Sequence, residues 1–180
     1  MPVPFLFLMV YFAHPTLTSL SCGFAVVALG EFTRLWGVSI AGSETRTTGP
    51  VGGTFLITTG PFAHVRNPLY VGNMLIYFGV GIMSMALFPW LAVGALLIFF
   101  LQYTLIVSLE EEHLREKFGD EFARYVASVP RFIPKPGRYQ SGSNEQPALD
   151  WRRGLRSERR TLQAIVLTTL ILILLRFVRN

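Results

Sequence analysis

Charged side chains are scarce in this chain of 180 residues. Asp, Glu, Lys and Arg together make up 15% of it, whereas a soluble domain carries about a quarter. All four types are missing from residues 1–30, 67–109 and 161–175. Because about 20 apolar residues cross a bilayer as a helix, these gaps exclude an ordinary soluble domain. They predict an integral membrane protein instead.

Cysteine is almost absent as well. Cys22 is the only one, so the chain has no disulfide framework and no CxxC metal site of its own. We expect Cys22 to be a buried structural thiol, because it lies in an apolar run and cysteine is among the most buried residue types. The sequence predicts no bound metal.

The longest uncharged segment, residues 67–109, predicts two membrane spans. It has 43 residues, and "FPW" at 88–90 marks a turn, because proline breaks a helix and Trp favours the membrane interface. We therefore expect residues 69–87 to cross the membrane and residues 91–109 to return. Antiparallel spans bring the chain back to the side it left, so Arg66 and Glu110 should meet at one membrane face.

The remaining apolar segments predict further helices. Residues 16–41 are long enough to cross but contain Glu31 and Arg34. These two charges pair with each other at i, i+3, lie at the membrane interface, or contact a substrate. Residues 3–13 are too short to cross upright. A last span, 162–178, follows the basic stretch "WRRGLRSERR". We predict an all-α, polytopic helical membrane protein with about four to five transmembrane helices in a single domain, residues 1–180.

The basic residues predict the orientation. Of the 16 Lys and Arg residues, 13 lie in residues 43–66 or 110–160, the two regions that the hairpin places on one side. The positive-inside rule makes that side cytoplasmic. The net charge of +5 then reflects orientation and an attraction to anionic membrane lipid. No basic groove interleaved with aromatic residues indicates a nucleic-acid partner, and the oligomeric state stays open.

An amphipathic helix is predicted directly after the hairpin. Apolar residues recur there at helical spacing, namely Leu114, Phe118, Phe122, Tyr125 and Val129. Gly119 followed by Asp120 indicates a break in this helix. The prolines at positions 130, 134 and 136 then predict an extended segment.

These motifs resemble a known family over residues 56–135. "GPFAHVRNPLYVGN", followed about forty residues later by "EEEHLREKFGDEFARYVASVPRFIP", is similar to the integral membrane methyltransferases of the isoprenylcysteine carboxyl methyltransferase and phospholipid N-methyltransferase superfamily. The matching positions are Arg66, Pro68, Tyr70, Gly72, Glu110, Glu111, Phe118, Gly119, Phe122, Tyr125, Pro130, Arg131 and Pro134. One departure stands out: the histidine that follows the arginine in the family is Asn67 here, and His64 is a candidate replacement.

The resemblance implies S-adenosylmethionine as cofactor, bound on the cytoplasmic side beside a lipophilic acceptor within the membrane. Arg66 would hold the cofactor carboxylate, and Glu110 or Glu111 its ammonium or ribose hydroxyls. Arg131 would orient an anionic acceptor, and it is our catalytic candidate together with Glu111. The cofactor-binding candidates are His64, Arg66, Asn67, Pro68, Tyr70, Asn73, Glu110, Glu111, Phe122 and Tyr125.

Several of these residues have an alternative interpretation. Arg66 alone is typical of a helix end anchored at lipid head groups, and the three consecutive glutamates are typical of a helix start. Gly79 and Gly81 either allow close helix packing or form a Gly-x-Gly cofactor motif. The methyl acceptor is a carboxylate or an amine. Two other functions stay open at this point: a non-enzymatic scaffold or channel, and a lipid double-bond reductase that uses a nicotinamide cofactor.

Overall fold

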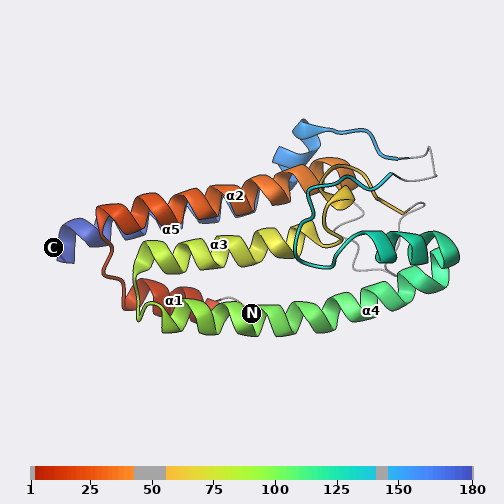
Figure 1. Cartoon of the computed structure of the whole chain (residues 1–180). Coiled ribbons are helices and arrows are strands. Elements are labelled where there is room, and N and C mark those ends of the chain that lie inside the picture. The colour runs from red at the N-terminus through yellow and green to blue at the C-terminus, as the bar shows by residue number, and fades with distance from the viewer. Residues whose placement is uncertain (1–2, 43–55, 141–145, 180) are drawn as a thin grey trace. The chain divides into compact units, whose positions relative to one another are not determined.

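The computed structural model describes residues 3–42, 56–140 and 146–179, and its regular elements in these ranges are all helical. In chain order they are α1 (Val3–Tyr11), α2 (Leu17–Ala41), the short 3₁₀ helix η2 (Gly60–Ala63), α3 (Pro68–Ser84), α4 (Trp90–Ser128) and α5 (Trp151–Arg179) (Figure 1). The predicted all-α membrane fold is confirmed.

Three of the helices are long and apolar enough to cross a bilayer. They are α2, α4 and α5, whose most apolar windows have mean hydropathies of 1.4, 2.2 and 2.2. Helix α3 is apolar but has only 17 residues. Helix α1 has nine residues, which cover less than half of the hydrocarbon core when upright. The turn predicted at "FPW" is confirmed, because α3 ends at Ser84 and α4 begins at Trp90.

Two details differ from the sequence predictions. Helix α5 begins at Trp151, so the basic stretch that was expected to precede the last span is itself helical. Cys22 is exposed, and the prediction that it is buried is wrong. A spanning helix presents apolar residues to lipid as well as to protein, so an apolar run does not tell which of its residues pack inside.

The chain forms two compact units. One comprises Met1–Phe32, Gly72–Leu101 and Arg159–Asn180, and the other Thr33–Val71 and Gln102–Glu158. We call them the first and the second unit. Their boundaries cut across α2, α3, α4 and α5, so each of these helices contributes to both units. Residues 43–55, which include the predicted cytoplasmic Arg46, lie outside the described ranges.

In the first unit, glycines allow α2 and α3 to approach closely. A Cβ atom at Gly79 would lie 2.7 Å from the carbonyl oxygen of Gly23 and 2.8 Å from the backbone nitrogen of Val27. A Cβ atom at Gly81 would lie 2.8 Å from the Cβ of Ala92 on α4. These contacts confirm the packing interpretation of Gly79 and Gly81, since small residues let membrane helices approach each other.

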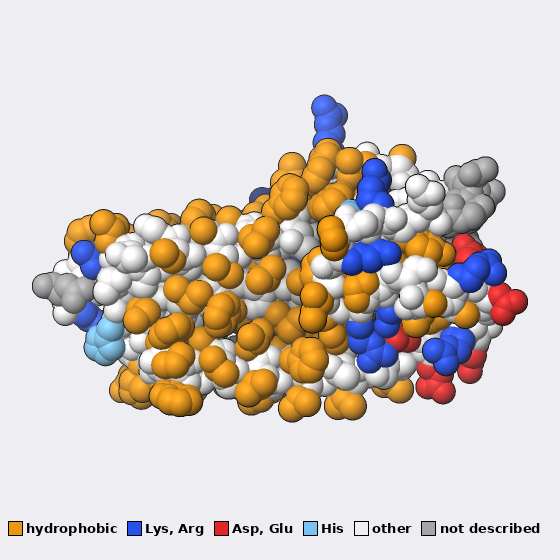
Figure 2. Space-filling view, viewed as in Figure 1, with side chains coloured by type: hydrophobic (Ala, Val, Ile, Leu, Met, Phe, Trp, Pro, Cys, Tyr) orange, Lys and Arg blue, Asp and Glu red, His pale blue; other side chains and the backbone are white. Residues whose placement is uncertain are grey.

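In the second unit, the end of α4 forms a small core. Leu56, Phe122, Tyr125 and Val129 are buried together, and Leu114, Phe118, Val126 and Tyr139 pack against them. The amphipathic face predicted after the hairpin is therefore confirmed. The break at Gly119 is confirmed as well, because this residue has φ 48° and ψ −122° inside the helix. Figure 2 shows hydrophobic side chains along the first part of α4 and charged side chains gathered around its far end.

We predict that Gly79→Ala destabilises the protein. The added methyl group would meet backbone atoms of α2, and overpacking of this kind costs about 1–3 kcal/mol. Gly94→Ala is the matched control, because a Cβ atom at Gly94 on α4 has no neighbour within 4 Å. Thermal unfolding in detergent should show a lower midpoint for Gly79→Ala only. Equal midpoints for the two variants would contradict the packing described here.

Candidate functional site

In the second unit, the segment before α3 is joined to the segment after α4 by backbone hydrogen bonds. The Arg66 amide donates to the Pro130 carbonyl (2.9 Å), and the Lys135 amide donates to the His64 carbonyl (3.0 Å). The Tyr139 amide donates to the Ala63 carbonyl (2.9 Å). Prolines keep the second segment extended, which leaves its backbone groups available for this pairing. The pairing fixes Arg66 and Arg131 beside each other.

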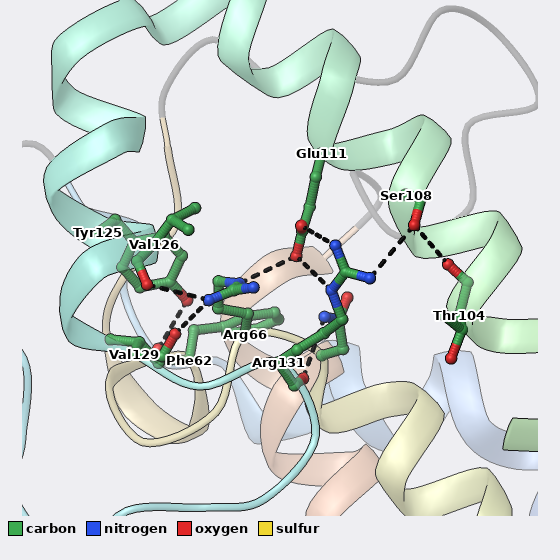
Figure 3. Close-up of polar contacts among 10 residues, drawn as sticks. Phe62, Arg66, Thr104, Ser108, Glu111, Tyr125, Val126, Val129 and Arg131 are labelled. Carbon is green, nitrogen blue, oxygen red and sulfur yellow. Dashed lines mark hydrogen bonds and ion pairs between the residues drawn. The ribbon is translucent and has the colours of Figure 1, made fainter.

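One carboxylate binds both arginines (Figure 3). Arg66 Nε donates to Glu111 Oε1 at 2.9 Å. Arg131 donates from Nη2 to Oε2 at 2.5 Å and from Nε to Oε1 at 3.3 Å. The side chains of Arg66, Glu111 and Arg131 are 11%, 12% and 31% exposed. The cluster has two positive charges and one negative charge, and Arg131 is its most accessible member.

Arg66 also closes the end of α4. Its Nη1 atom donates to the carbonyls of Val126, at 3.1 Å, and Val129. The last carbonyls of a helix have no partner within the helix and carry a partial negative charge, so a guanidinium stabilises them. With Nε on Glu111 and Nη1 on two carbonyls, Arg66 acts here as an anchor between the two segments. Its predicted role toward a cofactor carboxylate stays a prediction.

Arg131 has a second support from α4. Its Nη1 atom donates to Ser108 Oγ at 3.2 Å, and that hydroxyl donates to the Thr104 carbonyl at 2.8 Å (Figure 3). Ser108 was not among the site residues predicted from the sequence. Its position three residues before Glu111, on the same helix face, is the signal that could have identified it.

Glu110 lies in a different environment from Glu111. Tyr70 donates its hydroxyl to Glu110 Oε1 at 2.8 Å, and the Tyr70 ring stacks on Tyr103 with centroids 4.6 Å apart. Within the described residues, Glu110 makes no ion pair. It follows the charge-free span 91–109, and burial raises the pKa of its carboxyl, against the lowering effect of the Tyr70 hydrogen bond. Tyr103 was also missed, although it precedes Glu110 by seven residues, two helical turns.

The contacts of Glu110 and Glu111 confirm one central prediction. The two ends of the uncharged segment were expected to meet, and they do. Arg66 binds Glu111, and Tyr70 binds Glu110. Asn67 joins the same cluster, because its amide donates to the Arg131 carbonyl at 3.1 Å. Pro68 is buried at the first position of α3, where its fixed φ suits a helix start.

The other predicted site residues make their contacts outside the cluster of Arg66, Glu111 and Arg131. His64 Nδ1 is 2.9 Å from the Lys135 carbonyl, a contact that places the proton on Nδ1. Phe122 and Tyr125 are buried in the core cluster at 1% and 3% exposure. Burial raises the pKa of the Tyr125 phenol, which donates to the Phe62 carbonyl at 2.7 Å. Asn73 belongs to the first unit. Cofactor roles for these four residues stay predictions.

Comparisons with known proteins identify relatives of this chain. The family model "Phospholipid methyltransferase" matches residues 18–121, more than half of the chain, although Arg131 lies beyond the match. The chain is 35% identical over 127 residues to the cobalt-zinc-cadmium resistance protein CzcN of Cupriavidus metallidurans. The aligned residues cover 69% of this chain and 53% of that relative. It is 32% identical over 125 residues to the nickel-cobalt-cadmium resistance protein NccN of Alcaligenes xylosoxydans xylosoxydans, covering 69% and 54%.

The chain thus spans about half the length of these two relatives. The family match contains the uncharged segment and both glutamates of the site, Glu110 and Glu111. From this match we conclude that the chain belongs to the phospholipid methyltransferase family, within the superfamily of integral membrane methyltransferases that resemble isoprenylcysteine carboxyl methyltransferase.

Proposed function

We propose that this protein transfers a methyl group from S-adenosylmethionine to a lipophilic acceptor in the membrane. The proposal is supported by the family membership and by one observation above all. Glu111 binds two arginines that lie 65 positions apart in the chain, while its neighbour Glu110 makes no ion pair within the described residues. The second unit thus presents a partly exposed arginine and a carboxylate that is available to a cation.

The residues of this site fit the proposed cofactor. S-adenosylmethionine carries a carboxylate, an ammonium and a cationic sulfonium. We assign the carboxylate to Arg131, whose side chain is the most exposed of the cluster and whose planar guanidinium suits carboxylates. Glu110 suits the ammonium or the sulfonium, because a partly buried carboxylate attracts a cation strongly. Arg66 then acts through Glu111 as a positioning residue.

Bound S-adenosylmethionine would supply an electrophilic methyl group. The protein's own contribution to such a reaction is positioning and charge matching. Glu111 and Ser108 fix the guanidinium of Arg131, and Tyr70 fixes the carboxylate of Glu110. Arg131 also orients an acceptor that is anionic. We assign no general base, because the acceptor is a carboxylate or an amine and only the amine has a proton to lose.

We further propose that the site faces the cytoplasm and that the acceptor enters from the membrane. The first proposal rests on the 13 of 16 basic residues that flank the hairpin on one side. The second rests on the apolar helices that lead up to the site, since α4 carries an apolar window of mean hydropathy 2.2. Apolar helix surface suits a lipid tail, each buried CH₂ of which contributes about 0.8 kcal/mol to binding.

The two relatives are named as metal resistance proteins. Direct metal binding is not part of this proposal, because the described residues contain no group of three or more His, Cys, Asp or Glu side chains that could hold a metal ion. Methyl transfer to a membrane lipid is compatible with a contribution to resistance that does not involve holding the metal.

We predict that S-adenosylmethionine and S-adenosylhomocysteine bind the detergent-solubilised protein, and that Glu111→Gln weakens both. Glu111 is buried between two arginines and fixes the guanidinium of Arg131. Removing it costs about 3–5 kcal/mol of folding stability and leaves Arg131 without its fixed position, so both affinities should fall. Isothermal titration calorimetry measures both affinities, and a thermal-unfolding scan of each variant shows whether it is folded.

Glu112→Gln is the matched control for this experiment. Glu112 is exposed on the same helix, so its loss should cost less than about 1 kcal/mol of binding. Equal affinities for the two variants would contradict the role of Glu111. Absence of binding to either ligand by folded wild-type protein would contradict the proposed function as a whole.

We also predict that the methyl acceptor is found among lipids. Radiolabelled S-adenosylmethionine is supplied to the reconstituted protein with a membrane lipid extract and, separately, with the aqueous metabolite pool. Label should appear in the organic phase of the first reaction and be lost in Glu111→Gln. Label that appears only in the aqueous products would overturn the lipophilic acceptor while leaving methyl transfer intact.

A further inference from the structure

We propose that the first two turns of α5, residues 151–158, form a docking surface for the head groups of anionic phospholipids. This surface shares no residue with the proposed methyltransferase site, and the proposal holds whether or not the protein transfers methyl groups. It rests on the way one face of this helical segment is anchored in the second unit while the opposite face is left basic and exposed.

One face of the segment is fixed to α2. Arg34 Nη2 donates to Glu158 Oε2 at 2.8 Å, and the Glu158 side chain is only 1% exposed. Gly154 is buried against Ser39, and the Asp150 amide, one residue before the helix, donates to the Ser39 carbonyl at 2.8 Å. Gly154 and Glu158 are four residues apart and share a helix face. This contact determines which residues point outward.

The opposite face is basic. At 100° per residue, Arg152 and Arg156 project away from Gly154 and Glu158, and both are exposed. Within the described part of the chain, neither side chain makes a hydrogen bond or an ion pair. Arginines in the first turns of a helix are also disfavoured by its dipole. Among the described residues of the second unit, none pairs with these two charges, and this leaves them available to a partner outside the chain.

An apolar flank lies beside the basic face. Trp151 and Leu155 are again four residues apart, and they are 40% and 48% exposed. Helix α5 continues into residues 161–175, which carry no charge, so residues 151–158 lie at the end of a candidate membrane span. Tryptophan favours the membrane interface, and arginine can rest its apolar stem on lipid while its head reaches the phosphates.

Anionic phospholipid is the partner that matches both features. It offers a negative phosphate to Arg152 and Arg156 and an apolar region to Trp151 and Leu155. Clusters of four to eight basic residues next to a membrane span are typical of such lipid binding, and residues 151–160 contain five arginines. A nucleic acid or an acidic protein would satisfy the charges but would leave Trp151 and Leu155 exposed at the bilayer.

The test compares lipid preference in reconstituted full-length protein. Vesicles of phosphatidylcholine containing phosphatidylglycerol receive a spin-labelled lipid of either type, and the motionally restricted fraction at the protein is measured by electron paramagnetic resonance. Wild-type protein should prefer phosphatidylglycerol, and the preference should fall as salt is raised. The double variant Arg152→Gln/Arg156→Gln should lose most of it, by up to roughly fivefold per arginine.

Arg124→Gln/Arg138→Gln is the matched control. Both residues are exposed in the second unit, so the variant changes the net charge equally and should keep the preference. Three results would overturn the proposal: no preference in the wild type, an unchanged preference in Arg152→Gln/Arg156→Gln, or an equal loss in the control. Binding of a short RNA in lipid-free detergent that is lost in Arg152→Gln/Arg156→Gln would identify a nucleic-acid surface and overturn it too.

Discussion

The shared carboxylate of Glu111 is the interaction on which the site depends. Arg66 comes from the segment before α3 and Arg131 from the segment after α4, and both bind this one side chain. Without Glu111, the partly buried guanidinium groups of Arg66 and Arg131 would lie side by side and repel each other. Their attraction to Glu111 therefore supports the backbone pairing of the two segments and the closure of α4 by Arg66. A single charge thus holds together three parts of the second unit that are distant in sequence.

The neighbouring glutamate, Glu110, has different contacts because helix geometry separates it from Glu111. Consecutive residues on a helix project 100° apart, so Glu110 and Glu111 cannot both face the same partners. Glu111 points to the arginines, whereas Glu110 meets Tyr70 and makes no ion pair within the described residues. Glu111 thus organises the second unit, whereas Glu110 is the carboxylate that the proposed function assigns to the cationic part of the cofactor.

The sequence was sufficient to predict how the ends of the hairpin meet, since the length of the uncharged segment and Pro89 indicate two consecutive apolar helices joined by a turn. The helical spacing of apolar residues likewise predicted the core around Phe122. The contacts of individual side chains were harder to predict from the sequence. The contacts of Arg66 with Glu111 and with the end of α4 were not predicted, and its role toward a cofactor stays a prediction. Periodicity indicates which face of a helix is buried, whereas a long arginine side chain selects its partner through tertiary geometry. The exposure of Cys22 was missed because lipid-facing and protein-facing positions are both apolar.

A double-mutant cycle between Glu111 and Arg131 tests the central claim most directly. The affinity for S-adenosylhomocysteine is measured for wild type, Glu111→Gln, Arg131→Gln and the double variant. Because Glu111→Gln leaves two arginines without their shared partner, removing Arg131 as well should relieve part of the damage. We predict that the double variant loses less binding free energy than the two single variants lose together. The difference, the coupling energy, should be at least about 1 kcal/mol. Additive losses would show that the two residues act independently and would contradict the shared-carboxylate arrangement.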